Sequence, residues 1–434
     1  MTRMKESGID WIGKIPEEWR VMPIKHIVET PVTDGPHETP VLYETGIPFL
    51  SAEAVKDGVL DFNFKRGYIS LKDHDRFKKK ISPKKDDIFI VKSGATTGNV
   101  GIVNTDEIFD IWSPLALIRC NKTLAIQKYI YFYLLSTLFK SQVEFNWSFG
   151  TQQNIGMGVI ERIKVILPPV SEQQKIVEVL DKKTAQLDKA KALLEEQIQK
   201  LKDYRASLIY ETVTKGLDKT VPMKDSGIDW IGQVPEGWGV KPLKYLASYD
   251  DETLTQSEIN SNQKINYVDI GAVEFTKGIN GYQELLMSEA PSRARKIAKK
   301  GDTIISTVRT YLKEIAYLND DYIVSTGFCV VRPKKVNSKY LNYTIMSDSF
   351  TGPVSKYAWG VSYPAISSSQ LVNIPIPFPE SIEEQLSIVD YLDHKMLQIN
   401  QLIDIKQEQI DNINKQRQTL IYDYVTGKRR GKEI

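Results

Sequence analysis

The sequence predicts a mixed α/β protein built as an internal repeat, with two similar lobes and two long helices that pack together as a coiled coil. Three observations carry this prediction. A 24-residue segment near the N-terminus recurs in the second half of the chain. A long segment without proline or glycine follows each lobe, and both long segments repeat apolar residues every three to four positions. Internal repeats are sought first because missing them misassigns the whole fold.

The opening segment of each lobe is the clearest copy. Residues 4–27 read MKESGIDWIGKIPEEWRVMPIKHI and residues 223–246 read MKDSGIDWIGQVPEGWGVKPLKYL, with fifteen identical positions. The shared tryptophans are Trp11, Trp19, Trp230 and Trp238. Because they stand among prolines and apolar residues, packing within the lobe or against a helix explains them better than base stacking does.

The two long segments, residues 171–214 and 381–426, read as unbroken helices. The first begins EQQKIVEVLD from residue 172 and ends LIYETVT; the second begins EQLSIVDYLD from residue 384 and ends LIYDYVT. We expect Ser171 and Ser381 to cap their N-termini, and the next glycines, Gly216 and Gly427, to end them. Their length and lack of breaks predict helices that span several heptads.

A seam of period 3.5 predicts that these helices pack against each other rather than lie separately in solvent. Lys183, Lys395, Gln197 and Gln409 are polar interruptions at equivalent places, of the kind that fix register. The first predicted seam is Ile176, Leu180, Lys183, Leu187, Ala190, Leu194, Gln197, Leu201, Tyr204 and Leu208. The second is Ile388, Leu392, Lys395, Ile399, Leu402, Lys406, Gln409, Ile413, Gln416 and Leu420.

Each lobe alternates strand-like and helix-like stretches around a core of its own. Sequences inside the lobes diverge far more than the opening segments and helices do, which is typical of one scaffold that carries two different recognition surfaces. We therefore divide the chain into a first lobe (1–170), a first helix (171–218), a second lobe (219–380) and a second helix (381–434).

Composition favours a soluble, cytoplasmic protein without a membrane segment. Apolar residues make up 41% of the chain, and neither an apolar run of about 20 residues nor an N-terminal signal-like stretch is expected from the sequence. Cys120 and Cys329 lie in apolar strand-like runs and are expected to be buried. The net charge is only +2, but the helices carry a net negative charge, so a positive excess falls on the lobes.

No catalytic, cofactor or metal site stands out in the sequence. The single Pro-Pro pair lies in LPPV (167–170), outside any Asn/Asp-Pro-Pro-aromatic motif, and GATTGNVG (94–101) lacks a phosphate-loop lysine. The histidines His26, His37, His74 and His394 are scattered, and two cysteines cannot form a thiolate zinc site. We therefore expect no catalytic residue, cofactor or metal in this chain.

Basic clusters occupy similar places in both lobes and suit contacts to DNA phosphates, which position a protein without specifying sequence. A solvated charged face explains them about equally well. The first cluster is Arg76, Lys78, Lys79, Lys80, Lys84 and Lys85, and the second is Arg293, Arg295, Lys296, Lys299 and Lys300.

Polar turns offer donors and acceptors that could read bases in a major groove. Ordinary turn chemistry is the alternative explanation, since the same residue types favour turns. In the first lobe the candidates are Lys92, Ser93, Thr96, Thr97, Asn99, Thr151, Gln152, Gln153 and Asn154. In the second lobe they are Thr307, Arg309, Tyr311, Lys313, Ser362 and Tyr363.

This order of parts resembles the specificity subunits of type I restriction–modification systems over nearly the whole chain. The resemblance rests on SGIDWIGxxPExW at 7–19 and 226–238, and on LPPxSEQQKIVxxLD at 167–181 with a weaker copy at 378–393. The heptad helices ending in LIYxxVT complete it. The second junction departs from the pattern at Glu380, where we expect a small change in how the helix leaves the lobe.

The resemblance implies that each lobe is a target recognition domain that reads one half of a split, asymmetric double-stranded DNA site. It also implies that the helices pack antiparallel and dock two modification (N6-adenine methyltransferase) subunits, which a restriction subunit can join. S-adenosylmethionine, ATP and Mg²⁺ are then expected only in the partners.

Two alternatives remain open from the residues alone. One is a restriction enzyme with an unrecognised nuclease or methylase inside a lobe, which would act on DNA by itself. The other is a structural coiled-coil protein whose lobes bind proteins, which would not bind DNA.

Overall fold

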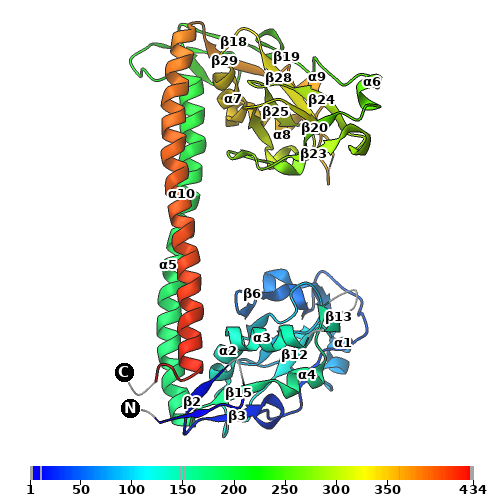
Figure 1. The fold of residues 1–434 in the computed structure, drawn as a ribbon, viewed down its shortest axis with the longest axis vertical. Coiled ribbons are helices and arrows are strands. Elements are labelled where there is room, and N and C mark those ends of the chain that lie inside the picture. Colours follow the sequence, from blue (N-terminus) through cyan, green and yellow to red (C-terminus); the bar gives the residue numbers. More distant parts are fainter. Residues whose placement is uncertain (1–2, 10–11, 147, 150–152, 361, 431–434) are drawn as a thin grey trace. The chain divides into compact units, whose positions relative to one another are not determined.

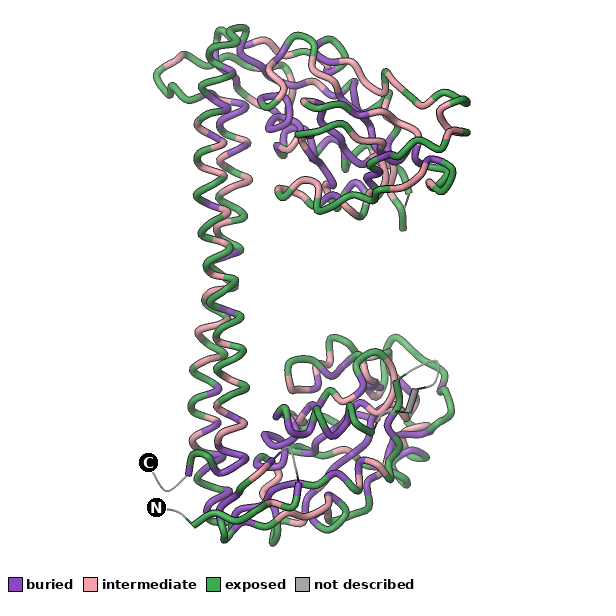
Figure 2. Tube along the Cα trace, in the orientation of Figure 1, coloured by how far each residue is buried: buried purple, intermediate pink, exposed green. Residues whose placement is uncertain are grey.

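The computed structural model describes residues 3–9, 12–146, 148–149, 153–360 and 362–430 (Figure 1). The chain forms two compact units, an N-terminal unit of Met1–Leu194 with Glu408–Ile434 and a C-terminal unit of Glu195–Gln407. Each unit contains one lobe and part of each long helix. Buried residues concentrate inside the lobes, whereas the helices are largely exposed (Figure 2).

The long helices are α5 (Val170–Lys215) and α10 (Ile382–Val425). Gly216 and Gly427 follow them with φ of 70° and 75°, as expected for residues that end a helix in the left-handed region. The Ser381 hydroxyl accepts a hydrogen bond from the Glu384 amide and so caps α10. Ser171 instead lies inside the first turn of α5, because that helix already begins after Pro169.

Within each unit the two helices run antiparallel. In the N-terminal unit, Asp188 of α5 forms an ion pair with Arg417 of α10 at 3.3 Å. In the C-terminal unit, Arg205 donates to Asn400 at 2.8 Å and Lys406 donates to Gln197 at 2.6 Å. The predicted coiled coil of two long helices is confirmed.

The predicted seam has the right period but is one residue too early at several of its alternate positions, although Ile176 and Ile388 are buried as predicted. Lys183, Gln197 and Tyr204 are exposed, and their neighbours Thr184, Ile198 and Arg205 lie in the seam instead. The observed seam of α5 is Val177, Leu180, Thr184, Leu187, Lys191, Leu194, Ile198, Leu201, Arg205, Leu208 and Thr212. That of α10 is Val389, Leu392, Met396, Ile399, Ile403, Lys406, Ile410, Ile413, Arg417, Leu420 and Tyr424. The prediction started the alternation at Ile176 and Ile388, which are buried in the cores of the lobes, and kept that phase along the helices.

In the described part of the N-terminal lobe, two main sheets are accompanied by four short α-helices. The larger has the order β4 (Thr33–Asp34), β12 (Leu115–Ile118), β9 (Ile88–Val91), β10 (Val100–Ile102), β7 (Val59–Leu60) and β6 (Val55–Lys56). The smaller has the order β11 (Asp110–Ile111), β5 (Ile47–Leu50) and β8 (Gly67–Ile69). The helices are α1 (Leu71–Phe77), α2 (Gln127–Leu135), α3 (Thr137–Phe145) and α4 (Met157–Arg162).

The C-terminal lobe contains two four-stranded sheets. One has the order β19 (Ala247–Tyr249), β28 (Phe328–Pro333), β25 (Thr303–Ser306) and β26 (Ile315–Tyr317). The other has the order β23 (Gln283–Leu286), β20 (Lys264–Val268), β27 (Tyr322–Ser325) and β24 (Ala294–Ala298). A hairpin of β21 (Val273–Glu274) and β22 (Gly278–Ile279) accompanies α6 (Gln256–Ile259), α7 (Ser338–Met346), α8 (Asp348–Tyr357) and α9 (Ser368–Leu371).

Both lobes share a frame that consists of a hairpin and a two-stranded ladder beside the helices. The hairpins are β1 (Met4–Glu6) with β2 (Lys14–Pro16) and β16 (Met223–Asp225) with β17 (Gln233–Pro235). The ladders are β3 (Arg20–Pro23) with β15 (Lys164–Leu167) and β18 (Trp238–Pro242) with β29 (Pro375–Pro379). This frame is the folded form of the repeated opening segment and of the strand that leads into each helix.

The repeated tryptophans belong to this frame. Trp19 and Trp238 are buried, and their indole N–H groups donate to Glu172 at 3.1 Å and to Glu384 at 2.9 Å. Trp230 is half-buried and packs edge-on against Tyr357. Trp11 lies outside the described residues. For Trp19, Trp230 and Trp238 the packing interpretation is therefore confirmed.

The glutamine of each repeated Glu-Gln pair joins the lobe to its helix. Gln173 accepts from the Ile126 amide and donates to the Pro168 carbonyl, whereas Gln385 accepts from the Asn337 amide and donates to the Pro379 carbonyl. Both glutamines are buried, so these bonds fix the start of the helix against α2 or α7.

The cysteines are buried as expected, and burial raises the pKa of both Cys120 and Cys329 to about 12. Among the described residues, no group of three or more His, Cys, Asp or Glu side chains could hold a metal ion. In the same part of the chain, no helix is both long and apolar enough to cross a membrane.

Candidate nucleic-acid interface

In the N-terminal lobe, the structure brings together the two polar segments that were predicted separately. The turn between β9 and β10 contacts the hairpin of β13 (Ser148–Phe149) and β14 (Gln153–Asn154) through a bridge between Ser93 and Asn154. The Gly94 amide donates to the Gln153 carbonyl at 3.1 Å. Thr151 and Gln152 lie outside the described residues.

The candidate side chains of this turn divide into exposed and structural ones. Thr96, Asn99, Gln153 and Asn154 are exposed. Thr97 is buried, and its hydroxyl donates to the carbonyls of Gly94 and Gln153 at 2.7 and 3.0 Å. Thr97 therefore ties the two segments together, and the exposed residues form the accessible part of the site. A cavity of about 540 Å³, lined in part by these residues and α3, opens beside them.

The C-terminal lobe joins its two candidate segments in the same way. The turn between β25 and β26 is bonded to residues 359–366, since the Arg309 amide donates to Pro364 at 2.8 Å and the Ile366 amide donates to Thr307 at 2.9 Å. The Thr307 hydroxyl donates to Gly327 at 2.8 Å. Arg309 and Lys313 both have φ of 50°, a left-handed conformation that is uncommon for residues with a side chain.

Aromatic side chains dominate the exposed part of this second site. Trp359 is 80% exposed and Tyr363 is 68% exposed, and Tyr311 is also exposed. The guanidinium of Arg309 lies over the Tyr363 ring at 5.3 Å from its centroid. Ser362 is exposed beside Tyr363, and Lys313 forms an ion pair with Asp348 at 2.7 Å. Sequence reasoning missed Trp359; its signal was an unrepeated tryptophan in a glycine-containing loop.

Most side chains of the first basic cluster already have acidic partners. Lys78 pairs with Asp75, Lys85 with Asp106, and Arg76 with both Asp73 and Glu38. Lys79 and Lys84 are exposed, and neither forms an ion pair with another residue that the structure describes. Most cations of this cluster are therefore paired with carboxylates, and Lys79 and Lys84 remain accessible to a phosphate.

Lys80 and Lys92 are structural, because both contact the buried Asp34 at 2.7 and 2.9 Å. Burial acts to raise the pKa of Asp34, but the hydrogen bonds from these lysines outweigh it, so that the pKa lies below its ordinary value. Lys296 of the second lobe repeats this arrangement. It lies 2.6 Å from both Asp250 and the Phe328 carbonyl and is largely buried.

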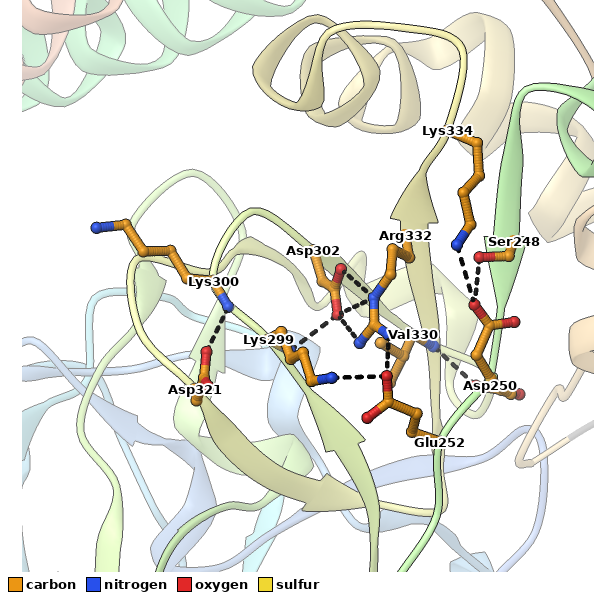
Figure 3. Close-up of polar contacts among 11 residues, drawn as sticks. Ser248, Asp250, Glu252, Lys299, Lys300, Asp302, Asp321, Val330, Arg332 and Lys334 are labelled. Carbon is orange, nitrogen blue, oxygen red and sulfur yellow. Dashed lines mark hydrogen bonds and ion pairs between the residues drawn. The ribbon is translucent and has the colours of Figure 1, made fainter.

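Lys299 of the second cluster lies in a network of charged residues around Arg332 (Figure 3). Arg332 bonds the buried Asp302 through Nε and Nη2, and bonds Glu252 at 2.5 Å; Lys299 also contacts Glu252, at 2.7 Å. These bonds raise the pKa of Arg332. In Figure 3 the ammonium of Lys300 points away from this network. Arg293 is exposed, and Arg295 donates to the Ala294 carbonyl.

Arg119 and Asp87 form the matching pair in the first lobe, bonded at 2.7 and 2.6 Å. The backbone amides of Lys84 and Lys299 donate to Asp87 and Asp302 respectively. The basic clusters therefore flank a duplicated structural ion pair that the sequence did not reveal, since its members are more than 25 residues apart.

Comparisons with known proteins agree with this architecture. The family model described as type I restriction modification DNA specificity domain matches residues 16–202 and 235–415. The MjaVIII specificity subunit of a type I restriction enzyme from Methanocaldococcus jannaschii is 24% identical over 97% of this chain and 95% of its own length. The putative MjaX specificity subunit of the same organism is 26% identical, with 97% and 96% covered.

A solved structure described as the structural basis underlying complex assembly and conformational transition of the type I R-M system has a similar fold. It aligns with a TM-score of 0.69 at 17% identity and covers 95% of this chain and 99% of that chain. The predicted combination of mixed α/β domains and long helices is therefore found in a known structure.

Proposed function

Because the chain belongs to the type I restriction–modification DNA specificity family, we propose that its two lobes read the two halves of an asymmetric, split DNA site. The family is one of non-catalytic subunits. In this role the chain directs partner methyltransferase and restriction subunits to the site, and the reactions take place in those partners.

The observation that best supports this proposal is the repeated pair of loops. Each lobe bonds a turn between two strands to a second polar segment more than 50 residues later, so that one platform of two joined loops carries the exposed side chains. The first platform presents Thr96, Asn99, Gln153 and Asn154. The second presents Arg309, Tyr311, Trp359 and Tyr363. Different side chains on the same platform would read different half-sites.

We assign the exposed residues of the platforms to base contacts, together with the predicted residues Ser93, Thr151, Gln152, Lys313 and Ser362. Amide side chains pair with adenine and arginine pairs with guanine in the major groove. We assign phosphate contacts to the exposed cations Lys79, Lys84, Arg293 and Lys300. Thr97, Lys92, Lys80 and Lys296 would act indirectly, by holding the loops in place.

The partners follow from the same role. The exposed surface of α5 and α10 would dock two methyltransferase subunits, which a restriction subunit would join. S-adenosylmethionine, ATP and Mg²⁺ would be bound by these partners, in the cytoplasm. The lobe and helix boundaries at 1–170, 171–218, 219–380 and 381–434 remain a prediction of the functional parts.

A methylation map tests the proposal. The chain is expressed with the methyltransferase subunit encoded beside it in a host that lacks adenine methylation, and modified adenines are located across the genome. We expect one asymmetric split motif that disappears when either subunit is omitted. A stable complex that methylates no motif would contradict the proposal and favour a protein-binding role. DNA cleavage or methylation by the purified chain alone would instead favour an enzyme.

A further inference from the structure

The two units differ at one buried position where a lobe meets its helices. In the N-terminal unit, Tyr131 of α2 lies beside Arg417 of α10, and Asp188 of α5 forms an ion pair with that arginine. Burial raises the pKa of Tyr131, and the nearby guanidinium partly opposes this shift. The arginine therefore has a carboxylate partner and an aromatic neighbour.

Two contacts that occur in both units establish which residues correspond in the C-terminal unit. Lys128 bonds Asp181 as Lys339 bonds Asp393, at 2.8 and 2.6 Å. The hydroxyls of Tyr129 and Tyr340 donate to the carbonyls of Ile166 and Pro377. With α2 and α7 aligned in this way, Tyr131 corresponds to Asn342, Asp188 to Asn400 and Arg417 to Arg205.

Arg205 of the C-terminal unit therefore lacks both neighbours of its counterpart. It donates to the neutral amide of Asn400 at 2.8 Å, and no carboxylate forms an ion pair with it among the described residues. Burial lowers its pKa, with no acidic group to oppose the shift. A partly buried guanidinium without a counter-charge is costly, so this position has an unfilled requirement for an anion.

The space left by the missing tyrosine ring is open. In the N-terminal unit, a Cβ on Gly58 would lie 2.4 Å from the Tyr131 hydroxyl, so that side chain fills the space beside the β6–β7 hairpin. The corresponding Gly278 of the β21–β22 hairpin has no atom within 4 Å of such a Cβ. A cavity of about 300 Å³ occurs here, lined by Arg205, Gly278, Asn342 and Asn400 among others.

The cavity wall suits a single carboxylate. Asn342 is only 7% exposed, and its Nδ2 group has no hydrogen-bond acceptor in the part of the chain that the structure describes. The other charges of the wall are matched, since Lys339 pairs with Asp393 and Lys277 pairs with Glu274. One guanidinium and one amide donor remain, which is the donor set that binds a carboxylate.

We infer that this cavity is a carboxylate-binding site that receives an aspartate or glutamate side chain of the methyltransferase subunit. The partner assignment rests on the proposed function, because Arg205 of α5 and Asn400 of α10 line this cavity, and these are the helices proposed to dock that subunit. A volume of about 300 Å³ holds an acidic side chain, since a liquid water occupies ~30 Å³. The N-terminal unit supplies its own carboxylate, Asp188, so only one of the two units has this site.

Free carboxylates test the site without any partner. Thermal unfolding of the full chain is measured in sodium chloride and in sodium acetate at equal ionic strength. We expect acetate to raise the Tm of the wild type by about 1–3 °C. N342Y, which restores the residue of the other unit, and N400D, which supplies a carboxylate internally, should remove this difference. Equal acetate effects in the wild type and N342Y, or none in the wild type, would overturn the carboxylate site.

Binding of the full chain to the methyltransferase subunit tests the occupant. We expect R205Q and N342Y to weaken binding by about 30-fold or more, and K224Q, which removes an exposed charge from the same lobe, to leave it unchanged. Wild-type affinity in both cavity variants would overturn the partner assignment but not the proposed function. If R205Q weakens DNA binding by the chain alone, the occupant of the cavity would be a DNA phosphate and not a carboxylate of the methyltransferase subunit. A wild-type chain that does not bind the subunit would contradict the proposed function, and the acetate measurement would still decide the site.

Discussion

The two places where a lobe meets its helix share a tryptophan–glutamate pair, but the glutamate has different surroundings in each. Glu172 is buried, accepts from Trp19, and is bonded by Arg430 at 2.6 and 3.0 Å. Glu384 is exposed and accepts from Trp238, and it forms no ion pair within the described part of the chain. The same tryptophan–glutamate pair is thus part of a buried charge network in one lobe and a solvated hydrogen bond in the other.

This difference shows how the two copies of a duplicated motif can contribute differently to the free energy of unfolding. Residues after α10 return to the N-terminal lobe, where Arg430 also bonds Glu18 at 3.2 Å and lies near the Trp19 ring. Burial acts to lower the pKa of Arg430, but its two glutamates outweigh burial and raise it. The sequence identity of the two copies is therefore a poor guide to what each copy contributes to stability.

The largest expected effect follows from removing Arg430. R430M would leave Glu172 buried without its counter-charge and should lower the free energy of unfolding by about 3–5 kcal/mol. Urea unfolding followed by tryptophan fluorescence measures this. R429M removes a neighbouring, exposed arginine paired with Asp423, and E384Q alters the solvated junction; each should cost less than about 1 kcal/mol. Equal losses in R430M and R429M would show that the buried network adds no stability.

The glycines that end the helices sharpen the same comparison. Both have positive φ, so alanine is strained at either site by about 1 kcal/mol. A Cβ on Gly427 would also lie 2.5 Å from Pro16 Cδ, whereas one on Gly216 would meet Trp238 at 3.3 Å. We expect G427A to cost about 2–4 kcal/mol and G216A about 1–2 kcal/mol in urea unfolding. The reverse order would mean that Pro16 yields more easily than Trp238.

The features predictable from the sequence are those encoded by neighbouring residues or by the repeat. The helices, their glycine ends and the polar turns follow from local composition, and the buried Trp19 and Trp238 follow from their copies. The contact between the turn at 92–99 and the hairpin of β13 and β14 was not predicted, since the two segments were identified separately in the sequence.

Features that depend on distant partners were not predictable. Lys80 and Lys296 looked like cations without a partner, but each pairs with an aspartate 46 residues earlier in the chain. The seam was misplaced because the alternation was started at Ile176 and Ile388, whose burial belongs to the cores of the lobes, so that apolar seam residues such as Ile198 and Ile410 were passed over. Trp359 was missed because exposure depends on the loops around it.

Trp359 tests whether the platform of the second lobe recognises DNA differently from the first. W359A should weaken DNA binding by the assembled complex by about 1–3 kcal/mol, because a largely exposed aromatic side chain would lose its contact with bases. Its unfolding free energy should change by less than about 0.5 kcal/mol. Both affinities are measured by filter-binding titration. Y245A, at an exposed tyrosine elsewhere in the lobe, is the control and should bind DNA as the wild type does. Unchanged affinity in W359A would remove this residue from the proposed interface.

The smallest expected effects separate two adjacent lysines of the first basic cluster. K80Q removes a hydrogen-bond donor from the buried Asp34 and should lower the free energy of unfolding by about 1–2 kcal/mol at neutral pH. K79Q alters an exposed cation and should leave stability unchanged, but reduce the salt dependence of DNA binding by about one counterion. Urea unfolding and binding at several salt concentrations measure both. If K79Q instead lowered stability and K80Q instead reduced the salt dependence, Lys79 would be the structural lysine and Lys80 the phosphate contact.

The pH dependence of K80Q provides a second measurement of the same ion pair. The pKa of Asp34 is lowered in the folded state, so its contribution is fully present above the ordinary value of 3.8 and is lost as pH falls through the lower folded value. K80Q weakens that shift, and the difference in stability from the wild type should therefore shrink below about pH 4. K79Q, which leaves Asp34 untouched, should follow the wild type at every pH. A K80Q deficit that persists undiminished at pH 3 would show that the lost stability comes from packing of the lysine stem.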